Sequence, residues 1–294
     1  MIDSGVMRIA DGYGRGRPVV SFEFFPPKTD AGFASLYRTI AELKQLDPGF
    51  VSVTWGAGGS TRRQTIELVT RIQDELGITA MAHLTCVGSS AAEIAAILDR
   101  LVEAGVENVL ALGGDPPRDA PDYRPPPGGF TYASELAAFI RTRWNLCIGG
   151  ACYPETHPRA ASPEADLDHL KQKVDAGVEF LITQLYFDNA DYFRFVDRAR
   201  ARGIGVPIVP GIMPIVSEAN IRRITTLSGA RIPPALDSRL AAVGHDDAQV
   251  MELGIEWSAR QCRELLDRGA PGLHFYTLNR SPATRRIHRS LFPA

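Results

Sequence analysis

The sequence predicts an α/β fold in which eight strands alternate with helices and close into a single (β/α)8 TIM barrel with extra helices before the last strand. Three observations predict it. Short apolar runs alternate with stretches of helical period, the runs are almost continuously apolar, as in strands buried on both faces, and eight such units fit into 294 residues. A doubly wound open sheet is the alternative that the same alternation allows.

The expected strands are short and rich in β-branched and aromatic residues. They are VVSFEFF (19–25), FVSVTW (50–55), TAMAHLTC (79–86), NVLALGG (108–114), LCIGGACY (146–153), FLITQLYF (180–187), PIVPGIM (207–213) and GLHFYTL (272–278). Amphipathic stretches between them predict helices at 31–46, 62–77, 91–105, 132–144, 163–177 and 189–203. Gly77, Gly105, Gly177 and Gly203 follow four of these helices, which suits left-handed C-caps.

No domain boundary interrupts this alternation. Residues 1–18 lack the apolar core of a secretory signal and are predicted to be a flexible lead-in with at most one helical turn. Residues 19–294 then form the barrel. The proline-rich stretch 118–129 is expected to be a long loop between a strand and a helix, and 217–269 is expected to insert two or three helices before the last strand.

Composition narrows the class of protein. A net charge of −2 gives no reason to expect nucleic-acid binding or a basic membrane patch, and no apolar run reaches the roughly 18 residues of a membrane-spanning helix. The cysteines Cys86, Cys147, Cys152 and Cys262 form no CxxC pair, and Cys147 and Cys152 would point to opposite faces of one strand. We therefore expect a reduced, cytoplasmic protein with buried thiols.

A carboxylate interrupts the first strand, because Glu23 lies between Phe22 and Phe24. An ionised carboxylate in apolar surroundings is costly unless it is paired. Burial favours its protonated form, which suits a general acid working near neutral pH. The alternative is a structural ion pair with an arginine or lysine at the barrel mouth.

Other polar residues gather where strands end, which is where the chemistry of TIM barrels is located. His83 is late in the third strand, although a lone histidine is more often a hydrogen-bonded core residue. Asp166, His169 and Lys173 share one helix face, which is either solvated or leans over the mouth so that Lys173 can meet a phosphate. The remaining strand-end residues are Thr54, Asp115, Tyr153, Glu155, His157, Gln184, Tyr276, Asn279 and Arg280.

Several other classes of site are not supported. His83, Asp115, Glu155 and His157 are conceivable metal ligands, but no HxH or HExxH pair is present, so no metal site is predicted. No GxGxxG follows a strand, which argues against dinucleotide binding of the Rossmann kind. A serine or cysteine nucleophile with a neighbouring base is not visible either.

Nine motifs occur in a fixed order: SFEFFPP, SVTWGAGG, AHLTC, ALGGDPP, ACYPETHP, DLDHLKQKVDAG, ITQLYFD, PGIMPI and HFYTLNR. Together they resemble the catalytic barrel of the methylenetetrahydrofolate reductase family, from about residue 19 to about residue 290. Because no further C-terminal region follows, we expect the compact bacterial form of this family.

The resemblance implies an activity, namely reduction of 5,10-methylenetetrahydrofolate to 5-methyltetrahydrofolate in one-carbon metabolism and methionine biosynthesis. It implies FAD as the cofactor that delivers the hydride, re-reduced by NADH or NADPH, and the sequence does not distinguish these two donors. It also implies a homo-oligomer that binds a small-molecule folate substrate, with neither a nucleic-acid nor a membrane partner.

The resemblance also implies roles for individual residues. Glu23 matches the general acid that opens the five-membered imidazolidine ring at N10, and Asp115 matches an aspartate that contacts both flavin and folate. Gln184, Tyr276 and Arg280 match folate contacts. The implied FAD contacts are Thr54, His83, Gly114, Asp115, Tyr132, Ala133, Tyr153, His157, Asp166 and Lys173.

The chain departs from the family pattern at three places. Gly113 replaces the arginine of ALRGD. In the helix motif LKRKVDAG, Gln172 replaces the second basic residue, and nearby His169 replaces an asparagine. Near Glu218, a stacking aromatic residue is missing. Losing two cations beside a diphosphate costs about 1–3 kcal/mol each if both contacts are direct. Two alternatives therefore stay open: the same reduction with weak or absent flavin and a soluble hydride donor, or a non-catalytic folate-binding subunit of a larger complex.

Overall fold

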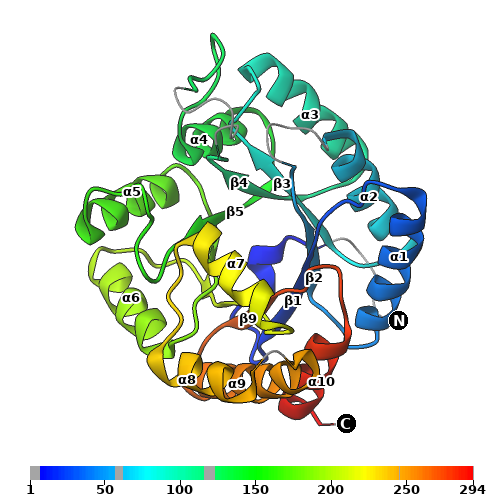
Figure 1. Ribbon diagram of the computed structural model, residues 1–294. Helices are drawn as coiled ribbons and strands as arrows, with labels where there is room; N and C mark the ends of the chain where they lie inside the picture. Colours follow the sequence, from blue (N-terminus) through cyan, green and yellow to red (C-terminus); the bar gives the residue numbers. More distant parts are fainter. Residues whose placement is uncertain (1–6, 57–61, 116–122, 245, 294) are drawn as a thin grey trace.

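The computed structural model describes residues 7–56, 62–115, 123–244 and 246–293, and in it a ring of strands is surrounded by helices (Figure 1). All strand pairs are parallel, in the order β7-β6-β5-β4-β3-β2-β1-β9-β8. The strands are β1 (Val19–Phe24), β2 (Phe50–Val53), β3 (Ala80–Thr85), β4 (Asn108–Leu112), β5 (Cys147–Cys152), β6 (Phe180–Thr183), β7 (Ile208–Val209), β8 (Gly211–Ile212) and β9 (Gly272–Tyr276).

The barrel closes at Pro210, which divides the expected seventh strand into β7 and β8. Proline has no N–H to donate to a neighbouring strand, so the ladder is interrupted there. Its carbonyl still accepts from the backbone N–H of His274 at 3.0 Å. Because β7 pairs with β6 and β8 with β9, one chain segment joins both ends of the sheet order. The predicted TIM barrel is thus confirmed, with a split strand that sequence alone did not indicate.

The helices lie where helical period predicts them and cover the outside of the ring (Figure 1). The predicted glycines 77, 105, 177 and 203 all have positive φ angles, as left-handed caps require. The helices between successive strands are α1 (Asp30–Lys44), α2 (Arg62–Leu76), α3 (Ala91–Glu103), α4 (Ala133–Arg143), α5 (Pro163–Asp175) and α6 (Asn189–Ala201).

Three helices precede the last strand, as predicted for 217–269: α7 (Glu218–Ser228), α8 (Pro234–Val243) and α9 (Asp247–Asp267). They pack around a second apolar cluster that includes Met213, Ile221, Leu240 and Trp257. A tenth helix, α10 (Pro282–Leu291), follows β9 and packs on α9; it lies beyond the last element that was predicted.

The two faces of β1 explain its mixed sequence. Phe22 and Phe24 are fully buried in the large cluster between strands and helices. Ser21 and Glu23 alternate with them and point to the other face, into the barrel. Glu23 is therefore not held between the phenylalanine rings, as its neighbours in sequence suggest, because successive side chains of a strand leave on opposite sides.

The start of the chain closes the other end of the barrel, so residues 7–13 are not a loose lead-in. The expected helical turn is the 3-10 helix Ile9–Gly12. Asn108, at the start of β4, accepts from the N–H of Ile9 at 2.8 Å and donates to the carbonyl of Met7 at 3.0 Å. Arg8 forms an ion pair with Glu179 at 2.9 Å, just before β6. The polar backbone of this segment is thus satisfied by the barrel bottom.

Two further sequence features bear on the class of protein. Cys86, Cys147, Cys152 and Cys262 are all buried, free thiols. In the described part of the chain, no helix is long and apolar enough to span a membrane. Much of the proline-rich stretch (116–122) and most of the glycine-rich turn after β2 (57–61) lie outside the described residues.

Candidate functional site

The centre of the candidate site is a group of polar side chains inside the barrel around Glu23. The Glu23 Oε2 atom lies 3.4 Å from Nε2 of His83 on β3 and 3.6 Å from Nε2 of His274 on β9. Ser52 on β2 is the register partner of Glu23. Buried Oγ of Ser52 and Nε2 of both histidines make no hydrogen bond to other described residues. Such atoms are costly when left alone, which marks them as a place for a ligand.

No cation explains the position of Glu23. Among the described residues, no arginine or lysine lies within ion-pair distance of its carboxyl group, which instead lies beside the imidazoles of the two histidines. Burial lowers the pKa of His83 to about 4, against an opposing effect of Glu23, so His83 is neutral near pH 7. The structural ion pair with an arginine or lysine, which the sequence left open, is therefore not formed in the described structure.

The motifs EFFPP and TLNR form one clamp at the mouth of the barrel. The Asn279 side chain donates to the carbonyl of Phe25 at 2.8 Å and accepts from its N–H at 3.0 Å. The Thr277 hydroxyl donates to the carbonyl of Glu23 at 2.6 Å. Leu278 and Asn279 both have positive φ angles, which non-glycine residues adopt only when the surroundings hold them there. These bonds fix the backbone that carries Glu23.

Tyr276 crosses from β9 toward β6. Its hydroxyl donates to the carbonyl of Thr183 at 2.5 Å, next to Gln184. Burial raises the pKa of Tyr276 well above its ordinary value, so its phenol stays protonated. Gly211 makes this possible, since a Cβ there would lie 2.7 Å from the tyrosine hydroxyl. Tyr276 thus forms a wall at the barrel mouth, and its contact with a substrate stays a prediction.

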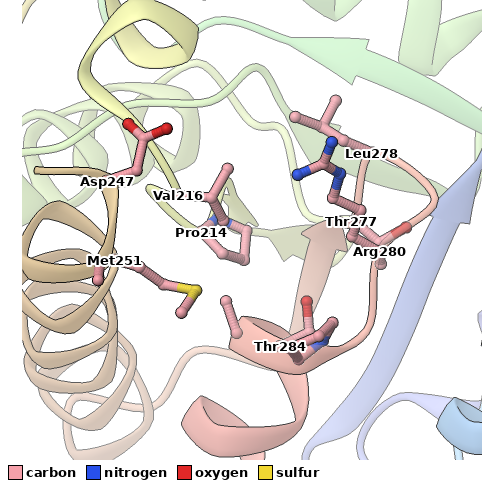
Figure 2. A pocket seen from close by; sticks show the side chains of 11 residues that line it. Pro214, Val216, Asp247, Met251, Thr277, Leu278, Arg280 and Thr284 are labelled. Atoms are coloured by element: carbon pink, nitrogen blue, oxygen red, sulfur yellow. The ribbon is translucent and has the colours of Figure 1, made fainter.

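A cavity of about 270 Å³ opens beside this wall, between α9, the loop after β9 and the start of α10 (Figure 2). Arg280 lines it on one side, and Met251 and Asp247 of α9 line the other. Pro214 and Val216 add apolar surface. A mainly apolar cavity with the Arg280 guanidinium on one side and the Asp247 carboxylate on the other suits an aromatic group that carries a carboxylate toward Arg280.

A second set of predicted residues lies on and after β5. The rings of Tyr153 and His157 meet edge to face with centroids 4.5 Å apart. Asp166 on α5 accepts from the backbone N–H of His157 at 2.9 Å, and Nδ1 of His157 accepts from the N–H of Arg159 at 3.0 Å. The ring hydrogen of His157 is therefore on Nε2, which is left to donate outward.

Lys173 reaches the same region from α5, where its ammonium donates to the carbonyl of Ala151 at 2.7 Å. Burial lowers its pKa. His169, which shares the predicted helix face, is instead exposed. The structure therefore directs Asp166 and Lys173 toward the barrel mouth but not His169.

These residues fit a large anionic cofactor such as FAD. Lys173 and His157 are donors on one side, and His83 Nε2 is an orphaned polar atom deeper inside. A Cβ added at Gly113 would meet no atom of the described residues within 4 Å, so these residues leave open space at the end of β4. Gly114, in contrast, has a φ of 82° and no room for a side chain, because its Cβ would lie 2.9 Å from Val87.

Other predicted residues lie at the rim of the site. Asp115 follows Gly114 and is exposed. Tyr132 is the N-cap of α4 and is 64% exposed, whereas the next residue, Ala133, is buried. The Thr54 carbonyl accepts a hydrogen bond from the Thr65 hydroxyl at 3.0 Å. Glu155, once considered with His83, Asp115 and His157 for a metal, pairs with Arg231 at 2.8 Å. Over the described ranges, no three histidine, cysteine, aspartate or glutamate side chains are placed so that they could hold a metal ion.

Sequence reasoning missed three residues of the central group: Ser21, Ser52 and His274. Each is fully buried and polar. The signal was present, since Ser21 is two residues before Glu23 and His274 two residues before Tyr276, so each shares a strand face with a predicted site residue.

Comparisons with known proteins identify the family of this chain. A family model described as "Methylenetetrahydrofolate reductase" matches residues 8–291. A relative from Pectobacterium carotovorum, "5,10-methylenetetrahydrofolate reductase", is 36% identical over 279 residues, which cover 94% of this chain and 91% of the relative. "Probable methylenetetrahydrofolate reductase (NADH)" of Oryza sativa is 39% identical over 285 residues, 93% of this chain and 48% of the relative, so the chain spans about half of that protein.

A solved protein of Clostridium thermocellum, which binds two copies of 5-methyl-5,6,7,8-tetrahydrofolic acid, has a similar fold. Its TM-score is 0.70 at 16% identity, over 97% of this chain and 96% of that one. At this identity the likeness concerns the fold, whereas the match to the family model covers almost every residue. The chain belongs to the methylenetetrahydrofolate reductase family.

Proposed function

We propose that this protein reduces 5,10-methylenetetrahydrofolate to 5-methyltetrahydrofolate, with Glu23 as the general acid. The observation that carries the proposal is the position of Glu23. Its carboxyl group lies inside the barrel, within 3.6 Å of two imidazoles. Family membership supplies the reaction, and this carboxyl group supplies the proton that the reaction needs.

The chemistry of Glu23 follows from its surroundings. Its side chain is 19% exposed, and the adjacent His83 is neutral near pH 7. Proton transfer from Glu23 to N10 of the folate would open the imidazolidine ring and leave an iminium carbon that can accept a hydride.

The folate would lie across the mouth of the barrel. Gln184 follows β6 and Asp115 follows β4, on either side of β5, and both would bind the polar edges of the pterin. Tyr276 would close one side, and Arg280 would meet the carboxylate of the substrate's tail in the cavity of Figure 2. This arrangement would hold the pterin end beside Glu23 and the charged tail nearer to solvent.

Bound FAD would supply the hydride, taken first from NADH or NADPH. Thr54, His83, Gly114, Asp115, Tyr132, Ala133, Tyr153, His157, Asp166 and Lys173 would hold it. The name of the Oryza relative favours NADH as the donor. Lys173 keeps two N–H donors beyond the one bonded to the Ala151 carbonyl, and His157 keeps its Nε2–H. These donors would meet the phosphate and ribose oxygens of FAD.

Glu23→Gln tests the proposal. The amide keeps the shape of the side chain but cannot donate an acidic proton, so folate turnover should fall by about 10²–10⁴-fold. NADH oxidation with a quinone acceptor, which needs no folate, should persist and serves as the control for folding and cofactor binding. Folate turnover at the wild-type rate in this variant would refute the role of Glu23.

A second candidate keeps the substrate and changes the hydride source. Gly113 and the exposed Gln172 stand where cations are expected, so the flavin would be weakly held and a soluble donor would act directly. The absorbance spectrum of the freshly purified protein separates the two. A flavin band at one equivalent per chain contradicts this candidate, whereas a colourless protein active without added flavin supports it.

A further inference from the structure

A line of polar side chains inside the barrel consists of Ser21, His274 and Glu23. The proposed reaction uses only Glu23. Ser21 and His274 are fully buried. Ser21 Oγ lies 2.8 Å from Nδ1 of His274, and His274 Nε2 lies 3.6 Å from Oε2 of Glu23. The line crosses the seam where β1 pairs with β9, with Ser21 directly opposite His274.

The two imidazoles converge on a single oxygen of the acid. His83 and His274 both direct Nε2 at the Glu23 Oε2 atom, at 3.4 and 3.6 Å. Neither nitrogen has a hydrogen-bond partner in the described part of the protein. The other oxygen, Oε1, is therefore the one left for a substrate. An acid that must deliver its proton to a bound molecule needs this asymmetry between its oxygens.

The Ser21 hydroxyl can select which nitrogen of His274 carries the ring hydrogen, because it contacts Nδ1. Its one hydrogen has two acceptors in reach, His274 Nδ1 at 2.8 Å and the Leu273 carbonyl at 3.3 Å. Donation to Nδ1, the shorter contact, leaves that nitrogen without hydrogen and places the ring hydrogen on Nε2, facing Glu23. The opposite tautomer would direct a lone pair at the carboxylate.

The other groups around His274 do not compete for this hydrogen. Phe50 of β2 stacks on its ring at 6.0 Å, and Tyr276 meets it edge to face at 5.3 Å. The titratable groups that face it are Glu23, Tyr276 and, beyond Glu23, His83. Tyr276 and His83 are both neutral near pH 7. In such low-dielectric surroundings, a hydrogen bond from a single N–H to a developing carboxylate is stronger than in water.

We propose that His274, held in its Nε2–H form by Ser21, is a positioning residue for the general acid. Its N–H donates to Oε2 and confines the acidic proton to Oε1. In the transfer, the O–H bond of Oε1 breaks, an N–H bond forms on the folate, and the electron pair stays on the Glu23 carboxylate. The His274 N–H then meets the new negative charge, so the contact strengthens as the reaction proceeds.

The separation of 3.6 Å is compatible with this role, because catalytic hydrogen bonds are often long without substrate and shorten when it binds. The inference rests on the proposed function of Glu23. It can be tested separately, because the tautomer of His274 is a property of the protein without substrate.

Nitrogen NMR of the full chain labelled at its histidine nitrogens measures that tautomer directly, with His274→Gln used to assign the signals. The expected result is a hydrogen on Nε2 in the wild type and a change toward Nδ1 in Ser21→Ala, which removes only the hydroxyl. A wild-type His274 with its hydrogen on Nδ1 would overturn the proposal, whatever the activity.

Kinetics give the second test. Ser21→Ala should slow folate turnover about tenfold at unchanged KM, and His274→Leu about 100-fold. His274→Gln should recover most of the rate, since its amide nitrogen can occupy the Nε2 position. NADH oxidation with a quinone acceptor should be unchanged in all three. Wild-type folate turnover in Ser21→Ala would overturn the proposal.

If His274→Leu does not fold, Ser21→Ala and His274→Gln decide the matter alone. A wild-type protein without folate turnover would instead refute the proposed function, and the NMR result would still decide the state of His274.

Discussion

Gly113 shows how one missing side chain can set the affinity for a cofactor. A Cβ added at Gly113 meets no atom of the described residues within 4 Å, and the φ angle of Gly113 is not in the left-handed region. A larger residue therefore fits there without strain. We expect Gly113→Arg to tighten FAD binding about tenfold, because a guanidinium beside a diphosphate forms charge-assisted hydrogen bonds. Fluorescence titration with FAD measures the change.

The matched control for this prediction is Gly113→Gln, which adds length without charge. Equal affinities for the arginine and glutamine variants would show that no phosphate of the bound cofactor lies within reach of residue 113.

His83 makes stability depend on pH. Burial holds its pKa at about 4 in the folded protein, below the ordinary value of about 6.5. Between these values the unfolded chain binds a proton that the folded protein does not, so stability falls as pH falls from 6.5 toward 4. From pH 7 to pH 5 this amounts to about 2 kcal/mol.

Urea unfolding at pH 7 and pH 5 measures this dependence, and His83→Gln should reduce it. His157 and His288, whose pKa values burial also lowers, remain in both proteins and cancel in the comparison. An identical pH dependence in the variant would contradict the assignment to His83.

Residue types alone indicated Glu23 as a candidate but not its neighbours. Glu23 was identifiable because a charge in an apolar strand is unusual. Ser21 and His274 share strand faces with Glu23 and Tyr276, but their contact with each other was not predictable. It joins positions 253 residues apart and depends on the register of β1 with β9. The exposure of His169 likewise depends on how α5 rolls against the sheet, which a spacing rule does not determine.

Helix α9 depends on a glycine in its interior. Replacing a helical glycine by alanine ordinarily stabilises a helix by about 1 kcal/mol. At Gly254 an alanine Cβ would lie 2.1 Å from the carbonyl oxygen of Ile215. We therefore expect the opposite sign, with Gly254→Ala destabilising by about 2 kcal/mol or more.

Chemical denaturation measures the effect, with Gly205→Ala as the control, because a Cβ at Gly205 meets nothing within 4 Å. A Gly254→Ala protein at least as stable as the wild type would mean that α9 can move away from the loop after β8.

Elements were predictable where hydrophobic period repeats. All expected strands and their intervening helices are present, with ends shifted by few residues. The division of the seventh strand at Pro210 could not be predicted, because it depends on which strands pair with the residues on either side of the proline. Helix α10 was missed because the sequence reasoning stopped at the motif that precedes it.

At the scale of the whole molecule, the barrel has a closed end and an open end. Residues 7–13 cover the closed end through Ile9, Asn108 and the Arg8–Glu179 pair. We expect deletion of residues 1–13 to lower the free energy of unfolding by about 3 kcal/mol or more, because it exposes apolar surface and leaves the buried Asn108 without partners.

Thermal unfolding measures this loss, and Arg15→Ala, at an exposed position just after the deleted residues, is the control. Because the site lies at the open end, affinity for folate should be unchanged while the shortened protein is folded. A loss of folate affinity without a loss of stability would contradict this division of the barrel.

The pairing of the first strand with the last has a consequence for biosynthesis. At about 5–20 residues per second, roughly 10–50 s separate the appearance of Ser21 on the ribosome from that of His274. During that time β1 has one exposed edge, and its carboxyl group lacks the partner that would aim it. A nascent chain therefore positions Glu23 for proton transfer only after its final strand, β9, has been made. Chains released before that point contain Glu23 but lack His274.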